Sequence, residues 1–204
     1  AQKTPSQKQM MGKKTNDGQK SFTQRLIGVR GMLTKAVFFD RDDTLIQDTG
    51  YMYKIADFKW MDGAIPALSL LRDAHIPIFI ATNQGGIGKG LFTLEQMQHF
   101  HNHLRAEGLR AGIPITDIAF CPHHPDAVIP EFAPPCSCRK PQPGMLQALA
   151  AKWQIDLSAS VMIGDRETDL EAGKRAGCTS LQLTSETDLP SLVSEAIKII
   201  DTEK

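Results

Sequence analysis

KAVFFDRDDTL, which spans residues 35–45, is the most informative segment of the chain. Its first half, residues 36–39, is a continuous apolar run that is typical of a strand buried on both faces. Asp40 and Asp42 follow this run and, two positions apart, leave its end in the same direction. Carboxylates are rarely buried unless they are paired or bound to a metal. The segment therefore predicts a site for Mg²⁺, a hard cation that takes oxygen ligands from carboxylates and substrate phosphate.

The same two acids also fit a purely structural interpretation, in which they open a turn or cap the next helix. Asp is favoured in both of these positions. The Asp-x-Asp spacing alone does not separate the two interpretations, so other parts of the chain must decide.

The composition is that of a soluble globular protein. The chain has 204 residues, of which 41% are hydrophobic and 23% charged, and this length suffices for one substantial core. No apolar run approaches the ~18 residues of a membrane-spanning helix. We expect a monomer with neither a membrane nor a nucleic-acid partner.

The basic residues are concentrated at the N-terminus. Residues 1–33 contain seven Lys or Arg and a single acid, Asp17, with few apolar residues. Such a segment cannot bury enough apolar surface to become ordered. We predict a flexible basic N-terminal tail over residues 1–33 and one domain over residues 34–204.

Short apolar runs alternate with helical patterns along the rest of the chain. Strands are predicted at residues 36–39, 77–81, 117–120, 160–164 and 178–184, and helices at 64–74, 93–111, 142–153, from about 168 to 177, and 189–200. This alternation is typical of an α/β fold with a doubly wound, mostly parallel sheet. Only about twenty residues separate Asp42 from the helix at residue 64, too few for a large cap domain.

Polar residues stand where four of these strands end. Asp40 and Asp42 follow the first strand, Thr82 and Asn83 the second, Cys121 the third and Asp165 the fourth. Parallel sheets bind ligands at the carboxyl ends of their strands. Three acids for Mg²⁺, a hydroxyl and a nearby lysine suit phosphoryl transfer, whose catalysis is mostly positioning and electrostatics.

The segment from Cys121 to Pro143 holds seven of the twelve prolines, so we expect neither a helix nor an interior strand there. Cys121-Pro-His123 and Cys136-Ser-Cys138 supply one imidazole and three thiolates, a set suited to tetrahedral zinc. The alternatives are four unrelated residues or a disulfide to another cysteine, and His124 is a spare ligand. Because no secretory signal accompanies the cysteines, metal binding in a reducing cytoplasm is favoured.

Two other patterns lead to plainer predictions. His99, His101 and His103 suggest a ligand cluster, but only His99 and His103 share a helix face, so we expect a solvated surface. The glycine-rich run at residues 85–90 matches neither common nucleotide-binding motif.

The motifs together carry a family resemblance. Asp40-x-Asp42-Asp43-Thr44 resembles the Asp-x-Asp-Gly-Thr signature of the haloacid dehalogenase superfamily, with Asp43 where glycine is usual. Three further segments follow in order: Ile80-Ala-Thr82-Asn83-Gln84, Cys121-Pro-His123-His124-Pro with Cys136-x-Cys138-Arg139-Lys140-Pro, and Gly164-Asp165. This set resembles the histidinol-phosphate and heptose-bisphosphate phosphatases of that superfamily.

The resemblance implies a Rossmann-like fold of the haloacid dehalogenase type without a large cap domain. It also implies catalytic, metal-binding and substrate-binding roles for particular residues. Asp40 would be the nucleophile and Asp42 the acid and base, with Mg²⁺ on Asp40, Asp165 and the carbonyl of Asp42. Zinc would take Cys121, His123, Cys136 and Cys138, in a loop at residues 121–140. The substrate would contact Asp48, Thr49, Gly50, Tyr51, Thr82, Asn83, Gln84, Gly85, Arg139, Lys140 and Arg166.

The implied activity is removal of the 7-phosphate of a heptose 1,7-bisphosphate through a phosphoaspartyl intermediate. Two alternatives stay open from the sequence. One is a histidinol-phosphatase. The other is a non-catalytic, zinc-stabilised binding module, for which Asp43 in place of glycine is the only support.

Overall fold

A five-stranded parallel sheet forms the centre of the protein, in a computed structural model that describes residues 33–202. The strand order is β3-β2-β1-β4-β5, and every neighbouring pair is parallel. The strands are β1 (Val37–Phe39), β2 (Ile78–Asn83), β3 (Ile115–Cys121), β4 (Val161–Gly164) and β5 (Thr179–Gln182). The predicted α/β class and parallel sheet are confirmed.

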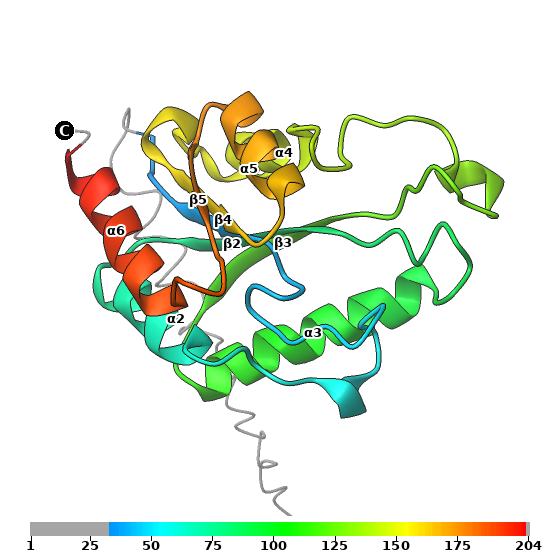
Figure 1. The fold of residues 1–204 in the computed structure, drawn as a ribbon, viewed down its shortest axis with the longest axis horizontal. Coiled ribbons are helices and arrows are strands. Elements are labelled where there is room, and N and C mark those ends of the chain that lie inside the picture. The colour runs from blue at the N-terminus through cyan, green and yellow to red at the C-terminus, as the bar shows by residue number, and fades with distance from the viewer. Residues whose placement is uncertain (1–32, 203–204) are drawn as a thin grey trace, which may run out of the picture. The chain divides into compact units, whose positions relative to one another are not determined.

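Helices cover both faces of this sheet, as Figure 1 shows. They are α2 (Ala64–Asp73), α3 (Leu94–Arg110), α4 (Gly144–Trp153), α5 (Glu167–Ala176) and α6 (Leu189–Thr202). Side chains alternate along β1, so Val37 and Phe39 join a core with α2, α3 and α6, while Phe38 joins a second core with α4. Burial on both faces explains why β1 is continuously apolar.

The ends of two helices follow from local chemistry. Thr93 caps α3: its hydroxyl accepts from the amide of Gln96, and the Gln96 side chain accepts from the amide of Thr93. This reciprocal pair is a capping box. Helix α5 ends at Gly177, whose φ of 93° is a left-handed conformation that glycine adopts without steric cost.

Two long connections lie at the carboxyl ends of the strands. Between β1 and α2, the chain contains only one short 3₁₀ helix, η1 (Ile55–Asp57), and no cap domain. Between β3 and α4 it is irregular apart from η2 (Pro130–Phe132), and a third 3₁₀ helix, η3 (Leu157–Ala159), precedes β4. The proline-rich segment 121–143 is therefore mostly irregular, as expected. The exceptions are Cys121, which is the last residue of β3, and the short helix η2.

The predicted N-terminal tail lies, except for Leu33, outside the described residues. Among residues 33–202, none of the helices has both the length and the apolar character required to cross a bilayer.

Candidate active site

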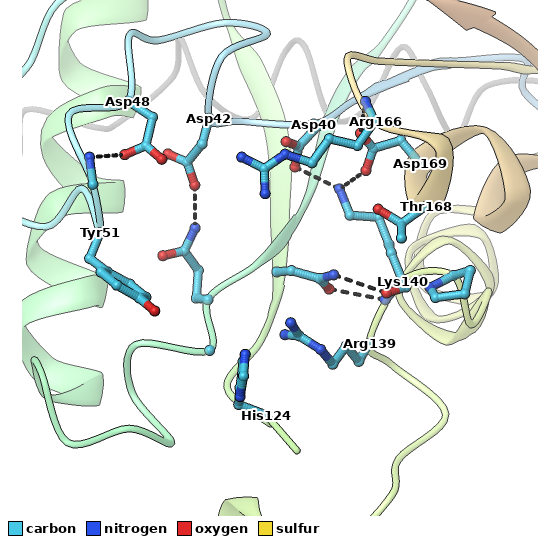
Figure 2. A pocket seen from close by; sticks show the side chains of 15 residues that line it. Asp40, Asp42, Asp48, Tyr51, His124, Arg139, Lys140, Arg166, Thr168 and Asp169 are labelled. Carbon is cyan, nitrogen blue, oxygen red and sulfur yellow. Dashed lines mark hydrogen bonds and ion pairs between the residues drawn. The ribbon is translucent and has the colours of Figure 1, made fainter. Parts of the chain in front are cut away.

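Strand ends bring the predicted acids and cations to one pocket of about 540 Å³ (Figure 2). Nine predicted residues line it besides Asp40 and Asp42: Asp48, Gly50, Tyr51, Asn83, Gln84, Gly85, Arg139, Lys140 and Arg166. Four others that were not predicted as substrate contacts also line it: His124, Pro141, Thr168 and Asp169.

Lys140 lies between two carboxylates at the base of this pocket. Its Nζ is 2.6 Å from Asp40 Oδ1 and 2.6 Å from Asp169 Oδ1, and it donates to the carbonyl of Ala81 at 2.7 Å. All three charged side chains are buried. Burial lowers the pKa of Lys140, but the neighbouring carboxylates of Asp40 and Asp169 outweigh it, and the pKa lies above its usual value. Lys140 is therefore a fixed positive charge beside Asp40.

Three carboxylates could hold a hard cation here. One oxygen each from Asp40, Asp165 and Asp169 lie within 4.8 Å of one another. Burial, and then the nearby charge of Asp40, raise the pKa of Asp165. Burial also raises the pKa of Asp169, although Lys140 opposes this. A group of oxygen donors that repel one another without a cation fits Mg²⁺.

Asp169 is the acid that the sequence prediction did not include. It lies in the first turn of α5, and its Oδ2 accepts from the backbone amide of Arg166 at 3.0 Å. Gly164 permits this approach, because a Cβ at that position would lie 2.4 Å from the Cβ of Asp169. The signal available in the sequence was an acid one helical turn after Asp165.

Asp42 is oriented by two neighbours. Gln84 donates from Nε2 to Asp42 Oδ2 at 2.7 Å, and Arg41 donates from Nε to Asp42 Oδ1 at 2.9 Å. Burial raises the pKa of Asp42, Arg41 lowers it and Asp40 raises it, with a net increase. A carboxyl group with a raised pKa suits a group that gives and takes a proton.

Three predicted residues lie apart from the pocket lining. Thr82 is fully buried, and its hydroxyl accepts from Gln84 Nε2 at 2.8 Å. Asp165 accepts from the Thr44 hydroxyl at 3.2 Å. The Thr49 hydroxyl contacts the Met52 sulfur at 3.3 Å.

Asp43 adopts a left-handed conformation, with φ of 56°. Glycine is usual at this position of the signature that the segment resembles, and Asp is one of the few other residues that tolerate this region. Asp43 also accepts from the amide of Asp48 at 3.1 Å, and Asp48 accepts from the amide of Gly50 at 2.8 Å. Asp43 thus anchors the loop at residues 48–51 that lines the pocket.

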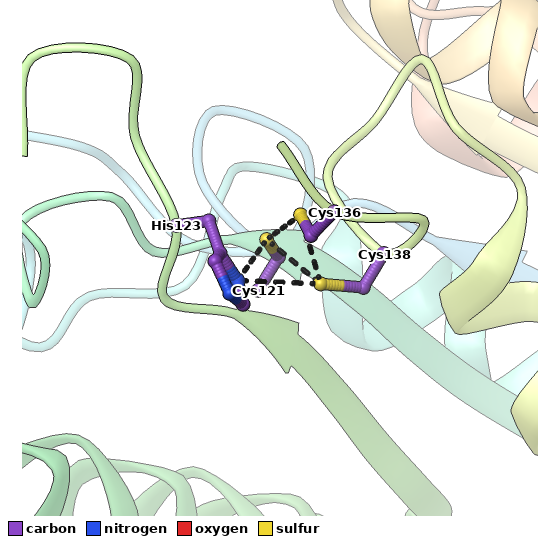
Figure 3. Close-up of side chains that lie close together, drawn as sticks. All are labelled: Cys121, His123, Cys136 and Cys138. Carbon is purple, nitrogen blue, oxygen red and sulfur yellow. Dashed lines mark hydrogen bonds between the residues drawn. The ribbon is translucent and has the colours of Figure 1, made fainter. Parts of the chain in front are cut away.

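The four predicted zinc ligands converge, as Figure 3 shows. The Cys121 sulfur is 3.6 Å from the Cys136 sulfur and 3.1 Å from the Cys138 sulfur. The sulfurs of Cys136 and Cys138 are 3.3 Å apart. His123 Nδ1 is 3.6 Å from the sulfurs of Cys121 and Cys138. Zn–S bonds of about 2.3 Å and a Zn–N bond of about 2.0 Å would separate tetrahedral ligands by roughly 3.5 to 3.8 Å.

The thiols are free, and their setting suits a metal. Burial raises the pKa of Cys121, so a thiolate there needs a cation to stabilise it. The three sulfurs and one imidazole fit zinc. Cys178 is buried and lies apart from this group.

The end of the cysteine loop is fastened to the sheet. Arg139 donates from Nη1 to the carbonyl of His123 at 2.9 Å. The Asn83 side chain makes two bonds with the backbone of Lys140, accepting its amide proton and donating to its carbonyl, both at 3.0 Å. The cysteine cluster and β2 together fix Arg139 and Lys140 at the pocket.

The solvated surface predicted for the histidines of α3 is wrong for His101. His99 is exposed and His103 is partly exposed, but His101 is only 6% exposed. Its ring packs edge-on against Phe120, because this face of α3 lies against β3. Its Nε2 lies 3.1 Å from Arg41 Nη1.

Two curated relatives named as heptose 1,7-bisphosphate 7-phosphatases resemble this chain over most of its length. The chain is 39% identical over 143 residues to the D-glycero-alpha-D-manno-heptose-1,7-bisphosphate 7-phosphatase of Photorhabdus laumondii, covering 70% of this chain and 78% of the relative. It is 37% identical over 141 residues to the D-glycero-beta-D-manno-heptose-1,7-bisphosphate 7-phosphatase of Escherichia coli K12, covering 69% and 74%. The chain belongs to the haloacid dehalogenase-like phosphatases.

Two further comparisons agree with this family. A HAD-hydrolase-like family model matches residues 137–199 of this phosphatase. A HAD-like phosphatase structure from Mesorhizobium loti superposes with a TM-score of 0.75 at 27% identity, over 85% of this chain and 91% of that one. The D,D-heptose 1,7-bisphosphate phosphatase of B. bronchiseptica, solved with magnesium and phosphate, gives 0.69 at 27% identity, over 81% and 99%.

Proposed function

We propose that this phosphatase hydrolyses the 7-phosphate ester of D-glycero-D-manno-heptose 1,7-bisphosphate, using Mg²⁺ and a covalent phosphate on Asp40. The observation that carries the chemistry is the buried pair of Asp40 and Lys140, with Asp165 and Asp169 beside it. The relatives of 37 to 40% identity named for this substrate carry the substrate assignment.

The reaction needs two steps at the same phosphorus atom. In the first, a carboxylate oxygen of Asp40 bonds to phosphorus, the bond from phosphorus to the sugar oxygen breaks, and Asp42 gives that oxygen a proton. In the second, Asp42 takes a proton from a water molecule that attacks the same phosphorus, which frees phosphate and restores Asp40. One residue can fill both roles because its raised pKa allows it to be protonated and deprotonated in turn.

Fixed charges in the pocket would stabilise the transferred group. Lys140, held from two sides, presents its ammonium where charge develops on the phosphoryl oxygens. Asp40 and Asp165, together with Asp169 or the carbonyl of Asp42, would hold Mg²⁺. The bound ion would neutralise part of that negative charge. The phosphate contact predicted for Thr82 stays a prediction.

The pocket chemistry also fits a substrate with two phosphates. Arg139, Arg166 and Lys140 place three cations around a cavity of about 540 Å³, and His124 lines the same wall. We assign Asp48, Gly50, Tyr51, Asn83, Gln84 and Gly85 to the sugar and the remaining phosphate. Zinc at the four-residue cluster would keep Arg139 in place, a structural role outside the chemistry.

A substrate panel tests the proposal. Phosphate release is measured with Mg²⁺ for the alpha and beta anomers of the heptose bisphosphate, heptose 1-phosphate and histidinol phosphate. We expect at least one anomer of the bisphosphate to have the largest kcat/KM among the four compounds. Heptose 1-phosphate should accumulate as the product. A larger kcat/KM for histidinol phosphate would overturn the substrate assignment, and no release from any ester would support the non-catalytic alternative. The monomeric state and cytoplasmic location stay predictions.

A further inference from the structure

Arg41 is a buried cation to which the proposed reaction assigns no role. It stands between the two aspartates of the signature, yet its side chain is 0% exposed. The guanidinium lies over the Phe100 ring, 4.9 Å from the centroid. Its Nη2 donates to the carbonyl of Met52 at 2.8 Å, and its Nη1 to the sulfur of Met97 at 3.1 Å. Burying a guanidinium is costly unless its donors are satisfied, so this set of partners requires an explanation.

The charged partner of Arg41 is Asp42. Arg41 Nε lies 2.9 Å from Asp42 Oδ1, and Arg41 Nη2 lies 3.1 Å from Asp42 Oδ2. Arg41 Nη2 is also 2.8 Å from Asp42 Oδ1, so both carboxylate oxygens contact the guanidinium, which limits the position and the plane of the carboxylate. Gln84 holds the same carboxylate from another side, at 2.7 Å.

His101 completes the set of acceptors around Arg41. Arg41 Nη1 lies 3.1 Å from His101 Nε2, and a guanidinium can only donate. His101 must therefore accept at Nε2 and carry its proton on Nδ1. Burial and the adjacent charges of Arg41 and Arg105 lower the pKa of His101 well below its usual value, consistent with a neutral ring.

We propose that His101 and Arg41 are positioning residues that hold the carboxyl group of Asp42 in the orientation needed for proton transfer to the leaving oxygen. The inference rests on the proposed function, since Asp42 matters in this way only if the protein cleaves phosphate esters. His101 fixes the tilt of the guanidinium from α3, and the guanidinium fixes Asp42. Without the acceptor at Nε2, Arg41 would keep its place in the core but lose one restraint on its rotation.

The leaving group separates this role from a general loss of structure. A sugar alkoxide needs a proton as it leaves, whereas p-nitrophenolate leaves without one. His101→Leu should therefore lower kcat for the heptose bisphosphate by roughly 10- to 100-fold, as small misplacements of a general acid do. Its KM for the heptose bisphosphate should change little, so kcat/KM for this ester falls together with kcat. For p-nitrophenyl phosphate, kcat/KM should change less than threefold, because it reports only the steps up to release of p-nitrophenolate, before Asp42 takes a proton from water.

Two variants control the comparison. His101→Gln keeps an acceptor near the former Nε2 and should restore most of the lost kcat. His103→Leu changes a partly exposed histidine of the same helix, whose Nε2 faces Glu107 at 3.5 Å, and should leave both activities unchanged. For His101→Leu, equal losses of kcat/KM on the two esters, or no loss on either, would overturn the inference.

Nitrogen NMR of the wild-type protein tests the premise without any turnover. The chain has six histidines, and His101→Gln identifies the signal that belongs to His101. At pH 7 we expect Nε2 without a proton and Nδ1 with one. A protonated Nε2 would overturn the inference even if the enzyme were active.

The failures are distinguishable. Histidinol phosphate also releases an alkoxide, so the His101 comparison can be repeated with it if the heptose assignment is wrong. A wild-type protein that is inactive on all three esters would overturn the proposed function and this inference together. If the wild-type protein is active and its His101 variants have the same activity on both esters, this inference alone would be overturned.

Discussion

The ammonium of Lys140 lies 2.6 Å from the carboxylate of Asp40, a residue one hundred positions earlier in the chain. The contact joins the end of β1 to the end of the cysteine loop, and Asp169 shares the same ammonium. Because both carboxylates are buried, their contact with the ammonium of Lys140 offsets part of the cost of removing them from water. The nucleophile and the cation that would stabilise its reaction are therefore one structural unit.

Asp40→Asn should abolish turnover because a neutral amide cannot attack phosphorus. The isosteric side chain keeps its volume, so the circular dichroism spectrum should be unchanged. Turnover is measured as phosphate release with Mg²⁺, and Asp73→Asn, at an exposed position on α2, serves as the control. Asp40→Asn protein that retains most of its activity would contradict a phosphoaspartyl mechanism.

The two metal sites should respond differently to chelation. Mg²⁺ on a few carboxylates keeps several waters and exchanges readily, so EDTA and gel filtration should remove an activity that added Mg²⁺ restores. Zinc in a Cys₃His site binds with apparent free energies of about 10 to 16 kcal/mol in small peptides, so it should survive this treatment. Elemental analysis should find one zinc per chain.

Cys138→Ser tests what the cysteine cluster does for the pocket. Loss of this ligand should release the loop end and raise KM, because Arg139 and Lys140 follow it directly. The matched control is Cys178→Ser, a buried cysteine that lies outside the cluster. Protein that contains no zinc when purified without chelator, or Cys138→Ser kinetics equal to wild type, would refute the zinc assignment.

Asp43→Gly should separate two roles of one residue. Glycine removes the strain of a φ of 56°, a gain of up to about 1 kcal/mol, but it also removes the acceptor for the Asp48 amide. We expect little change in melting temperature and a rise of a few-fold in KM, because the loop at residues 48–51 loosens. Asp43→Asn keeps the acceptor and should have a KM near that of wild type; equal KM values in all three proteins would show that this bond is unimportant.

Asp117 should make stability depend on pH in acid. Burial raises the pKa of this carboxyl, but hydrogen bonds from Lys152, Trp153, the Ile118 amide and Arg105 outweigh it and lower the pKa from 3.8 to about 2. A lowered folded-state pKa stabilises the fold above about pH 4, and this stabilisation is lost as the pH falls toward 2. Allowing for solvent screening, it contributes about 1 to 2 kcal/mol at neutral pH.

Urea unfolding of wild type and Asp117→Asn between pH 2.5 and 7 measures this contribution. The variant should be less stable at pH 7, and the difference should shrink as the pH falls below 4. A difference that is constant over this range would mean that lost packing, and not charge, explains the change.

Much of the fold follows from local sequence patterns. The five predicted strands and five predicted helices all exist, with ends that differ from the predictions by up to two residues. Buried parallel strands are continuously apolar, and residues such as Thr93 and Gly177 define helix ends locally. The order of the strands in the sheet was beyond these patterns, because it depends on contacts between distant segments.

The residues of the candidate site were predictable where they belong to recognisable sequence motifs. Asp40 and Asp42 after a buried strand, and the cysteines and histidine of a proline-rich loop, were recognisable from the sequence, and the structure brings each set together. Asp169 and His101 were missed for a common reason. Each lies in a helix, where an acid in the first turn or a histidine among polar neighbours is ordinary, and only the packing of α5 and α3 gives it a special partner.

The paired hydrogen bonds between the Asn83 side chain and the Lys140 backbone imitate the pairing of two strands. Cys121 ends β3 at one side of the loop, and this amide holds the other side, so both ends of the intervening segment are fixed independently of its length. The register of Lys140 to Asp40 thus does not depend on the number of residues in the segment 125–135. Changes at exposed positions of that segment, such as Val128, would therefore leave the reaction centre intact.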